Sequence, residues 1–83
     1  MVSLDEFVEL IYKTRDKELI KDFFMGLTTP YERKVLLRRV ELVNRLLKGE
    51  AQHEIAKDLG LGVSTVSRGA KELRLGRFKV LRK

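Results

Sequence analysis

The chain has 83 residues, no cysteine, one histidine and a formal net charge of +6. This length predicts a single domain, residues 1–83, that is too short to bury a large core alone, so oligomerisation is a natural source of further burial. Without cysteine a disulfide framework and a thiolate metal site are excluded; without a basic leader or a spanning apolar run, we expect a cytoplasmic protein with no membrane segment.

Charge divides the sequence into two unlike parts. Residues 1–32 hold four Lys/Arg and seven Asp/Glu, whereas residues 33–83 hold fourteen Lys/Arg and five Asp/Glu. A basic part beside an acidic part favours a polyanion-binding end and a separate scaffold end. A solvated basic surface without a partner is the ordinary alternative.

The first two predicted elements are amphipathic helices. Apolar residues recur at helical spacing over residues 4–14 and again over residues 17–25. Asp5 and Glu6 suit the N-terminal turn of the first helix. We expect Gly26 to end the second helix by adopting a left-handed cap.

A long third helix is predicted from Pro30 to Lys48, with its end at Gly49. Thr29 and Glu32 have the spacing of a capping box around Pro30. The apolar stripe is wide, which is what a central helix shared between two subunits requires. Its members are Val35, Leu36, Leu37, Val40, Leu42, Val43, Leu46 and Leu47.

A helix-turn-helix follows, from about residue 52 to residue 74. It consists of a short helix over 52–59, a turn at Gly60-Leu61-Gly62 and a second helix from Val63 to about Arg74. Gly60 supplies the positive backbone angle of the turn, and Ala56 is small enough for a steep helix crossing. The residues that should fill its interior are Ile55, Leu59, Leu61 and Val66. The basic tail, residues 75–83, is either a final helical turn or a loose arm.

The start of the second helix carries the residues that suit DNA. In such motifs this end enters the major groove, where short hydroxyl groups and one small apolar group meet base edges. An ordinary helical hairpin is the alternative. The candidate base contacts are Val63, Ser64, Thr65 and Ser67, and the candidate phosphate contacts are Gln52, His53, Ser67, Lys71 and Arg74. A lone histidine indicates a surface contact and no metal site.

Gly69 lies in the middle of the second helix, where glycine costs roughly 1 kcal/mol relative to alanine. One interpretation is an early helix end. The other is a slot for a flat ligand, flanked by the guanidinium planes of Arg39 and Arg68, with Thr29 bonding an anionic group. An i, i+4 ion pair between Arg68 and Glu72 is the ordinary expectation for those two residues.

Three segments resemble the tryptophan repressor family: LTTPYERK at residues 27–34, RRVELVNRLLKGE at 38–50 and GLGVSTVSRGAKEL at 60–73. The resemblance covers roughly Phe7 to Arg74. It implies an all-α, intertwined helical homodimer with a helix-turn-helix. Such a protein is a transcriptional repressor that binds pseudo-palindromic operators in double-stranded DNA, with L-tryptophan as corepressor and no other cofactor.

The resemblance also implies roles for ligand-binding residues. Arg39 and Arg68 would sandwich the indole, Gly69 would leave room for it, and Arg68 and Thr29 would bind the carboxylate. Backbone carbonyls around Gly26 and Thr28 of the other subunit would take the ammonium group.

The chain departs from the family pattern at several places. Glu72 stands where the family has a serine near the ligand ammonium, so it either strengthens amine binding or pairs with Arg68 and competes with the ligand. Ala56 replaces a basic phosphate contact, the segment before the helix-turn-helix is one residue shorter, and the family's C-terminal helix is reduced to LGRFKVLRK.

Three other functions compete with a tryptophan-responsive repressor. One is a regulator of the same fold that ignores tryptophan or senses another small molecule. Another is the DNA-reading fragment of a transposase-like enzyme, but the chain has no evident catalytic set, so we expect no enzyme, and a start at Met1 argues against a fragment. The last is a helical interaction module that does not read DNA.

Overall fold

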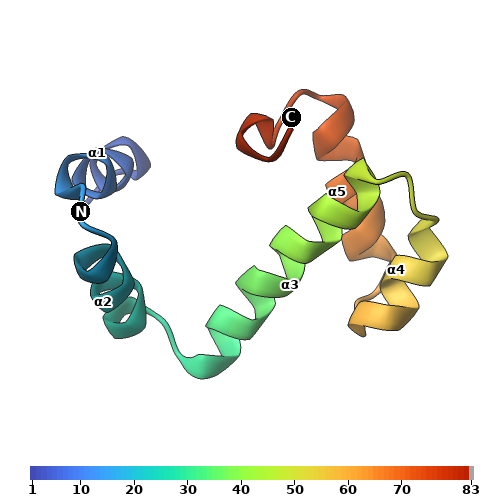
Figure 1. Cartoon of the computed structure of the whole chain (residues 1–83), viewed down its shortest axis with the longest axis horizontal. Helices are drawn as coiled ribbons and strands as arrows, with labels where there is room; N and C mark the ends of the chain where they lie inside the picture. Colours follow the sequence, from blue (N-terminus) through green and yellow to red (C-terminus); the bar gives the residue numbers. More distant parts are fainter. Residues whose placement is uncertain (83) are drawn as a thin grey trace. The chain divides into compact units, whose positions relative to one another are not determined.

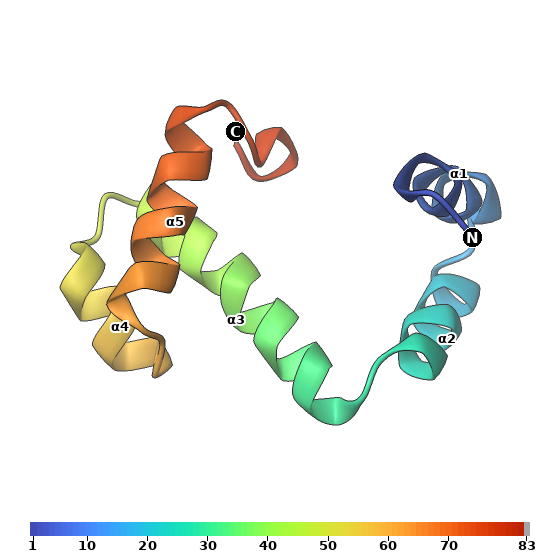
Figure 2. The same cartoon turned by 180° about the vertical axis from the view of Figure 1, so that it is seen from behind.

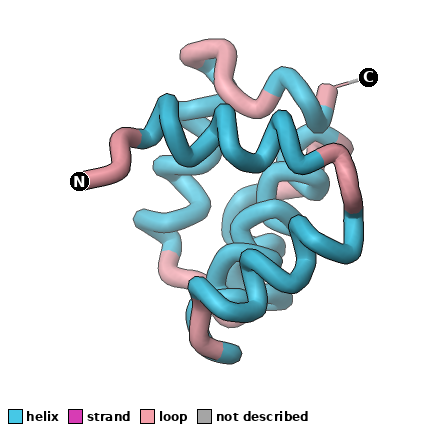
Figure 3. Tube along the Cα trace, turned by 90° about the vertical axis from the view of Figure 1, so that its left-hand side faces the viewer, coloured by secondary structure: helices cyan, strands magenta, loops and turns pink. Residues whose placement is uncertain are grey.

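The computed structural model describes residues 1–82, and every regular element in that range is helical (Figure 3). This confirms the all-α class that the sequence predicts. No helix in the described range is long and apolar enough to cross a membrane. The elements in chain order are α1 (Leu4–Thr14), α2 (Lys17–Leu27), α3 (Pro30–Leu47), α4 (Gln52–Leu59), α5 (Val63–Arg74) and the 3-10 turn η1 (Lys79–Leu81).

Residues Met1–Arg33 form one compact unit, and a second unit begins at Lys34. In the N-terminal unit, the Ser3 hydroxyl accepts the backbone N–H of Glu6, and the Glu6 carboxylate accepts the N–H of Ser3. This capping box satisfies two of the N–H groups that the start of α1 leaves free. Asp16 caps α2 in a similar way, accepting the N–H groups of Glu18 and Leu19.

An aromatic cluster joins α1 to α2. The ring centroids of Phe7 and Phe23 lie 5.8 Å apart, and Phe24 meets both rings edge-on, at 6.4 Å from Phe7 and 6.2 Å from Phe23. These tilted and edge-on arrangements are the ones that aromatic quadrupoles favour. The three rings are only half-buried, and no residue of this unit is fully buried.

The end of α2 differs from the expectation. Gly26 is not in the left-handed region, and the helix runs two residues beyond the predicted range of 17–25, through Gly26 to Leu27. Thr28 ends it in an extended conformation, and the Arg33 guanidinium donates to the carbonyl oxygens of Met25 at 3.3 Å and Thr28 at 2.5 Å. A left-handed glycine is unnecessary here because an arginine side chain satisfies carbonyl groups at the helix end.

The capping box predicted at the start of α3 is confirmed. The Thr29 hydroxyl accepts the N–H of Glu32 at 3.1 Å, and the Glu32 carboxylate accepts the N–H of Thr29 at 2.8 Å. This backbone hydrogen bond from Thr29, helped by the Thr29 side chain, lowers the pKa of Glu32. At the other end α3 stops at Leu47, and Gly49 takes a positive φ of 84°.

In the C-terminal unit, α4 and α5 form a helix-turn-helix beside the C-terminal half of α3 (Figures 1 and 2). The turn is made as predicted, with Gly60 at φ 64°. Ile55, Ala56 and Val66 are buried together with Leu42 of α3, so the predicted interior is confirmed. The partly buried residues packed against this core are Leu46, Leu59 and Leu61.

Arg45 ties the end of α3 to the helix-turn-helix. Its guanidinium lies 2.6 Å from a carboxylate oxygen of Glu50 and 2.7 Å from one of Asp58, which is on α4. The hydrogen bonds to Glu50 and then Asp58 raise the pKa of Arg45 above its already high ordinary value. This bridge links the last turn of α3 to the loop residue Glu50 and to α4.

Candidate nucleic-acid interface and pocket

The start of α5 presents the predicted base-contacting edge to solvent. Val63, Ser64 and Ser67 are exposed, and Thr65 is half-buried. Val66, between them, points into the core, as helical spacing requires. The edge is therefore accessible to a partner without unfolding the motif.

Both helices of the helix-turn-helix begin without a side-chain cap. Ala51 precedes α4 and Gly62 precedes α5, and neither provides a capping hydrogen bond. By contrast, α1, α2 and α3 are capped by Ser3, Asp16 and Thr29. The first N–H groups of α4 and α5 are left for another acceptor, and phosphate oxygens suit such helix ends.

The candidate phosphate-contacting residues are also exposed: Gln52, His53, Ser67, Lys71 and Arg74. Two of them are linked, because the Ser67 hydroxyl donates to the Gln52 side-chain carbonyl at 3.3 Å. His53 Nε2 lies 3.5 Å from Glu54 Oε1 on the surface of α4. Within the described residues no cluster of His, Asp and Glu that could hold a metal ion is found.

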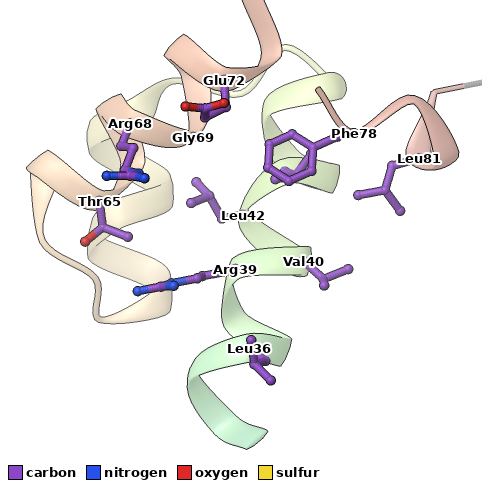
Figure 4. A pocket seen from close by; sticks show the side chains of 11 residues that line it. Leu36, Arg39, Val40, Leu42, Thr65, Arg68, Gly69, Glu72, Phe78 and Leu81 are labelled. Atoms are coloured by element: carbon purple, nitrogen blue, oxygen red, sulfur yellow. The ribbon is translucent and has the colours of Figure 1, made fainter. Parts of the chain in front are cut away.

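A pocket of about 660 Å³ opens in the C-terminal unit between α3, α5 and the tail (Figure 4). Its volume lies within the range of small-molecule sites. The lining is largely apolar, with a few polar groups. The lining residues are Leu36, Arg39, Val40, Leu42, Val43, Thr65, Arg68, Gly69, Glu72, Phe78 and Leu81.

The two arginines of the pocket lie apart from its aromatic wall. Figure 4 shows Arg39 of α3 and Arg68 of α5 on one side, with Thr65 near them, and Phe78 on the opposite side. Helical geometry explains the first grouping, because Thr65, Arg68 and Gly69 follow the i, i+3, i+4 spacing of one helix face. The structure thus brings Arg39, Arg68 and Gly69 to one pocket.

Gly69 is explained in part by helix packing. The helix α5 continues through it to Arg74, so an early helix end is wrong. A Cβ atom at this position would lie 3.2 Å from Leu42 Cδ2 and 3.6 Å from Leu46 Cδ1. The missing side chain therefore lets α5 approach α3 closely, while the same residue still lines the pocket.

Glu72 has a different partner from the one expected. Its carboxylate lies 3.5 Å from Arg77 Nε, and among the described residues no ion pair joins it to Arg68. The i, i+4 expectation is thus wrong here, because the chain turns back after α5 and brings Arg77 to Glu72. Arg68 remains exposed at the pocket edge.

The other candidate ligand residues, Gly26, Thr28 and Thr29, belong to the N-terminal unit. The Thr28 carbonyl and hydroxyl both accept hydrogen bonds from Arg33, at 2.5 and 3.2 Å. The Thr29 hydroxyl accepts the capping bond of α3, and its own proton is free to be donated.

The sequence did not reveal the pocket residues supplied by the tail. Of the two alternatives for the tail, the final helical turn is confirmed and the loose arm is wrong: residues 75–82 turn back and include the 3-10 turn η1, while Lys83 lies outside the described residues. Phe78 and Leu81 line the pocket. A signal was present in Gly76 and in the i, i+3 spacing of Phe78 and Leu81, which suits a 3-10 turn.

Comparisons with known proteins agree with this architecture. The family model described as Trp repressor protein matches residues 2–80. A Trp operon repressor homolog of Vibrio campbellii is 41% identical over 70 residues, covering 83% of this chain and 70% of the relative. Homologs with the same description in Vibrio parahaemolyticus and Vibrio cholerae are 41% and 36% identical over 70 residues, in each case covering 83% of this chain and 68% of the relative.

The family match, residues 2–80, spans the helix-turn-helix, the helices before it and the pocket lining except Leu81. The comparisons confirm the resemblance that the three sequence segments indicated, and they identify a transcriptional regulator of the DNA-binding kind rather than an enzyme. The chain belongs to the Trp repressor family.

Proposed function

We propose that this protein is a homodimeric repressor that binds a pseudo-palindromic operator, with L-tryptophan as its corepressor. The observation that carries the proposal is that α5 belongs to two surfaces, the exposed edge and the pocket. Its N-terminal edge is exposed for base contacts, and the face behind that edge lines the pocket with Thr65, Arg68 and Gly69. A ligand in the pocket touches the helix that reads DNA.

Two features support DNA reading by α5. The edge carries the exposed residues Val63 and Ser64 and the half-buried Thr65, which also lines the pocket, so one apolar group and two hydroxyl groups are available to base edges. The uncapped starts of α4 and α5 add backbone N–H groups beside the linked pair Gln52 and Ser67. Phosphate contacts there would fix the position of the edge in the groove.

Three features of the pocket support an aromatic amino acid as ligand. The guanidinium groups of Arg39 and Arg68 stack well on aromatic rings, and Arg68 also suits a carboxylate. The apolar lining suits the ring. The Glu72 carboxylate suits the ammonium group, because an opposite charge close by favours both ionised forms.

Exposed apolar residues support the dimer. On α3, Leu37 is 69% exposed and Leu36, Val40 and Leu47 are also exposed, although their spacing predicts a buried stripe. Apolar residues on α1 and α2 are exposed as well. Large exposed apolar surface on a small chain marks an interface, and an intertwined second copy supplies the same kind of surface.

The mechanism is a population shift. Two copies of α5 must stand about 34 Å apart to meet successive major grooves. The ligand favours repression only if it binds that arrangement more tightly than the others, since a ligand with equal affinity for both shifts nothing. Contacts with Arg68 and Gly69, on the reading helix, provide such a difference.

Operator selection from random duplex DNA, performed with and without L-tryptophan, tests the proposal. We expect a two-fold symmetric site that is enriched more strongly when L-tryptophan is present. Enrichment of a symmetric site that is equal in both arms would contradict the corepressor. The absence of any enriched site would contradict sequence-specific reading.

The ligand residues are tested by calorimetry with L-tryptophan. Arg39→Ala removes one stacking plane and should weaken binding by about ten-fold, whereas Arg38→Ala removes the same charge from the neighbouring position outside the pocket lining. Gly69→Leu is a poorer test, because the new side chain meets Leu42 before it reaches any ligand.

Glu72 supports one alternative function, a regulator of the same fold that takes another small molecule. Its carboxylate already contacts Arg77, so amine recognition competes with an ion pair within the chain. Calorimetry that compares L-tryptophan with indole and with indole-3-propionate separates the alternatives. L-tryptophan should bind best if Glu72 takes the ammonium group, whereas tighter binding of the ligands without an amine would favour the alternative.

A further inference from the structure

We infer that the C-terminal tail forms one wall of the ligand pocket and contributes to ligand binding. Within this wall, Phe78 makes the pocket selective for a flat aromatic ligand. The inference rests on the proposed function and adds a specificity-determining residue to it. Phe78 is 37% exposed and lines the pocket from the side opposite Arg39 and Arg68 (Figure 4).

The tail turns back because of a glycine motif at the end of α5. The N–H of Gly76 donates to the Leu73 carbonyl at 3.1 Å, and the N–H of Arg77 donates to the Glu72 carbonyl at 3.0 Å. Gly76 has a φ of 92°, which completes the Schellman pattern of helix ends. The chain therefore reverses at a defined position and does not trail away from α5.

Side chains then brace the reversed segment. The Arg77 guanidinium contacts Glu72 at 3.5 Å, and the Arg82 guanidinium donates to the carbonyl oxygens of Leu73 and Arg77. Phe78 itself has a φ of 63°, in the left-handed region that favours glycine. A bulky residue persists there only where its surroundings fix it.

The pocket walls then differ in chemistry. Arg39 and Arg68 offer guanidinium planes on one side, while Phe78 offers an aromatic ring and Leu81 an aliphatic surface on the other. Aromatic pairs gain free energy beyond simple area burial, whereas an aliphatic occupant gains only the burial. The tail therefore favours an aromatic amino acid over an aliphatic one of similar polarity.

The test is calorimetry of the full chain with L-tryptophan, indole and L-leucine. Phe78→Ala should weaken L-tryptophan binding by about ten-fold and reduce its preference over L-leucine. Phe78→Leu keeps an apolar side chain and should fall between Phe78→Ala and the parent. Val80→Ala is the matched control, since Val80 lies in the same turn but is 93% exposed and outside the lining.

The outcomes separate the two proposals. If the parent binds L-tryptophan and both Phe78 variants bind it equally well or more tightly, the inference is wrong while the proposed corepressor stands. If the parent binds neither L-tryptophan nor indole, the proposed corepressor is wrong and the role of Phe78 falls with it. Circular dichroism melts of each variant verify that the helices are retained. If Phe78→Ala does not fold, the L-tryptophan affinity of Phe78→Leu relative to the parent tests the inference.

Discussion

The N-terminal and C-terminal units differ in what they bury, although both consist of amphipathic helices. In the C-terminal unit, α3, α4 and α5 enclose Leu42, Ile55 and Val66 almost completely. In the N-terminal unit, α1 and α2 pair through Phe7, Phe23 and Phe24, and none of their residues is fully buried.

Amphipathic spacing thus specifies which face of a helix is apolar but not which element covers that face. The helix-turn-helix completes its core within one chain, because Ile55, Ala56 and Val66 pack together with Leu42 of α3. A two-helix hairpin has no third element to close it. We therefore expect the C-terminal unit to depend on its own core and the N-terminal unit to depend on the proposed partner copy.

The largest effect is expected in the helix-turn-helix core. Ile55 is 0% exposed, so Ile55→Ala should lower the free energy of unfolding by about 2–5 kcal/mol, measured by urea denaturation. Leu75→Ala, at a position 68% exposed, is the control and should change it by less than about 0.5 kcal/mol. Equal losses at both positions would show that the core is not where the structure has it.

The next effect concerns the proposed dimer. Leu37→Glu places a charge on the exposed apolar side of α3 and should raise the dimer dissociation constant by at least about ten-fold, because an unpaired charge is costly to bury. Val80→Glu places the same charge on the exposed tail turn and should leave the dimer dissociation constant unchanged. Sedimentation equilibrium measures both, and a dimer unaffected by Leu37→Glu would remove α3 from the interface.

Two helical glycines give a smaller contrast between the units. A Cβ atom at Gly26 meets nothing within 4 Å, so Gly26→Ala should stabilise the protein by about 0.4–1 kcal/mol. Gly69→Ala should stabilise the protein less than Gly26→Ala does, or should destabilise it, because its Cβ atom would lie 3.2 Å from Leu42 Cδ2. Thermal melts of the pair measure the difference, and a larger gain at Gly69 would contradict the close packing of α5 on α3.

The smallest effect is expected at the capping box of α3. Capping lowers the pKa of Glu32 in the folded state, so its stabilisation is present above the ordinary glutamate pKa of about 4.5 and is lost as the pH falls through the folded value. Glu32→Gln should therefore lower the melting temperature slightly at neutral pH and progressively less below pH of about 4. Glu41→Gln, an exposed position of the same helix, serves as the control. A difference that grows in acid would reverse the assigned sign.

Prediction from sequence succeeded where the signal is local. The start of α3 follows from its capping residues, and the start of α5 follows from apolar spacing after the turn. The turn itself follows from the positive φ at Gly60. All three were placed correctly. It failed at Gly26 because Arg33, seven residues further along the chain, takes over the helix end. It failed at Glu72 because Arg77 reaches that carboxylate only after the chain reverses.

Local patterns in the sequence were enough to predict the helices, the helix-turn-helix and the family, because propensity, capping and short motifs act between near neighbours along the chain. The sequence also grouped Arg39 and Arg68 around Gly69, but the contribution of the tail to the pocket became visible only with the packed structure. Arg39, Arg68 and Phe78 come from three separate segments, and they meet because α5 packs on α3 across Gly69 and the tail folds back at Gly76. Contacts of that kind depend on the direction in which packed helices cross, and no local pattern encodes that direction.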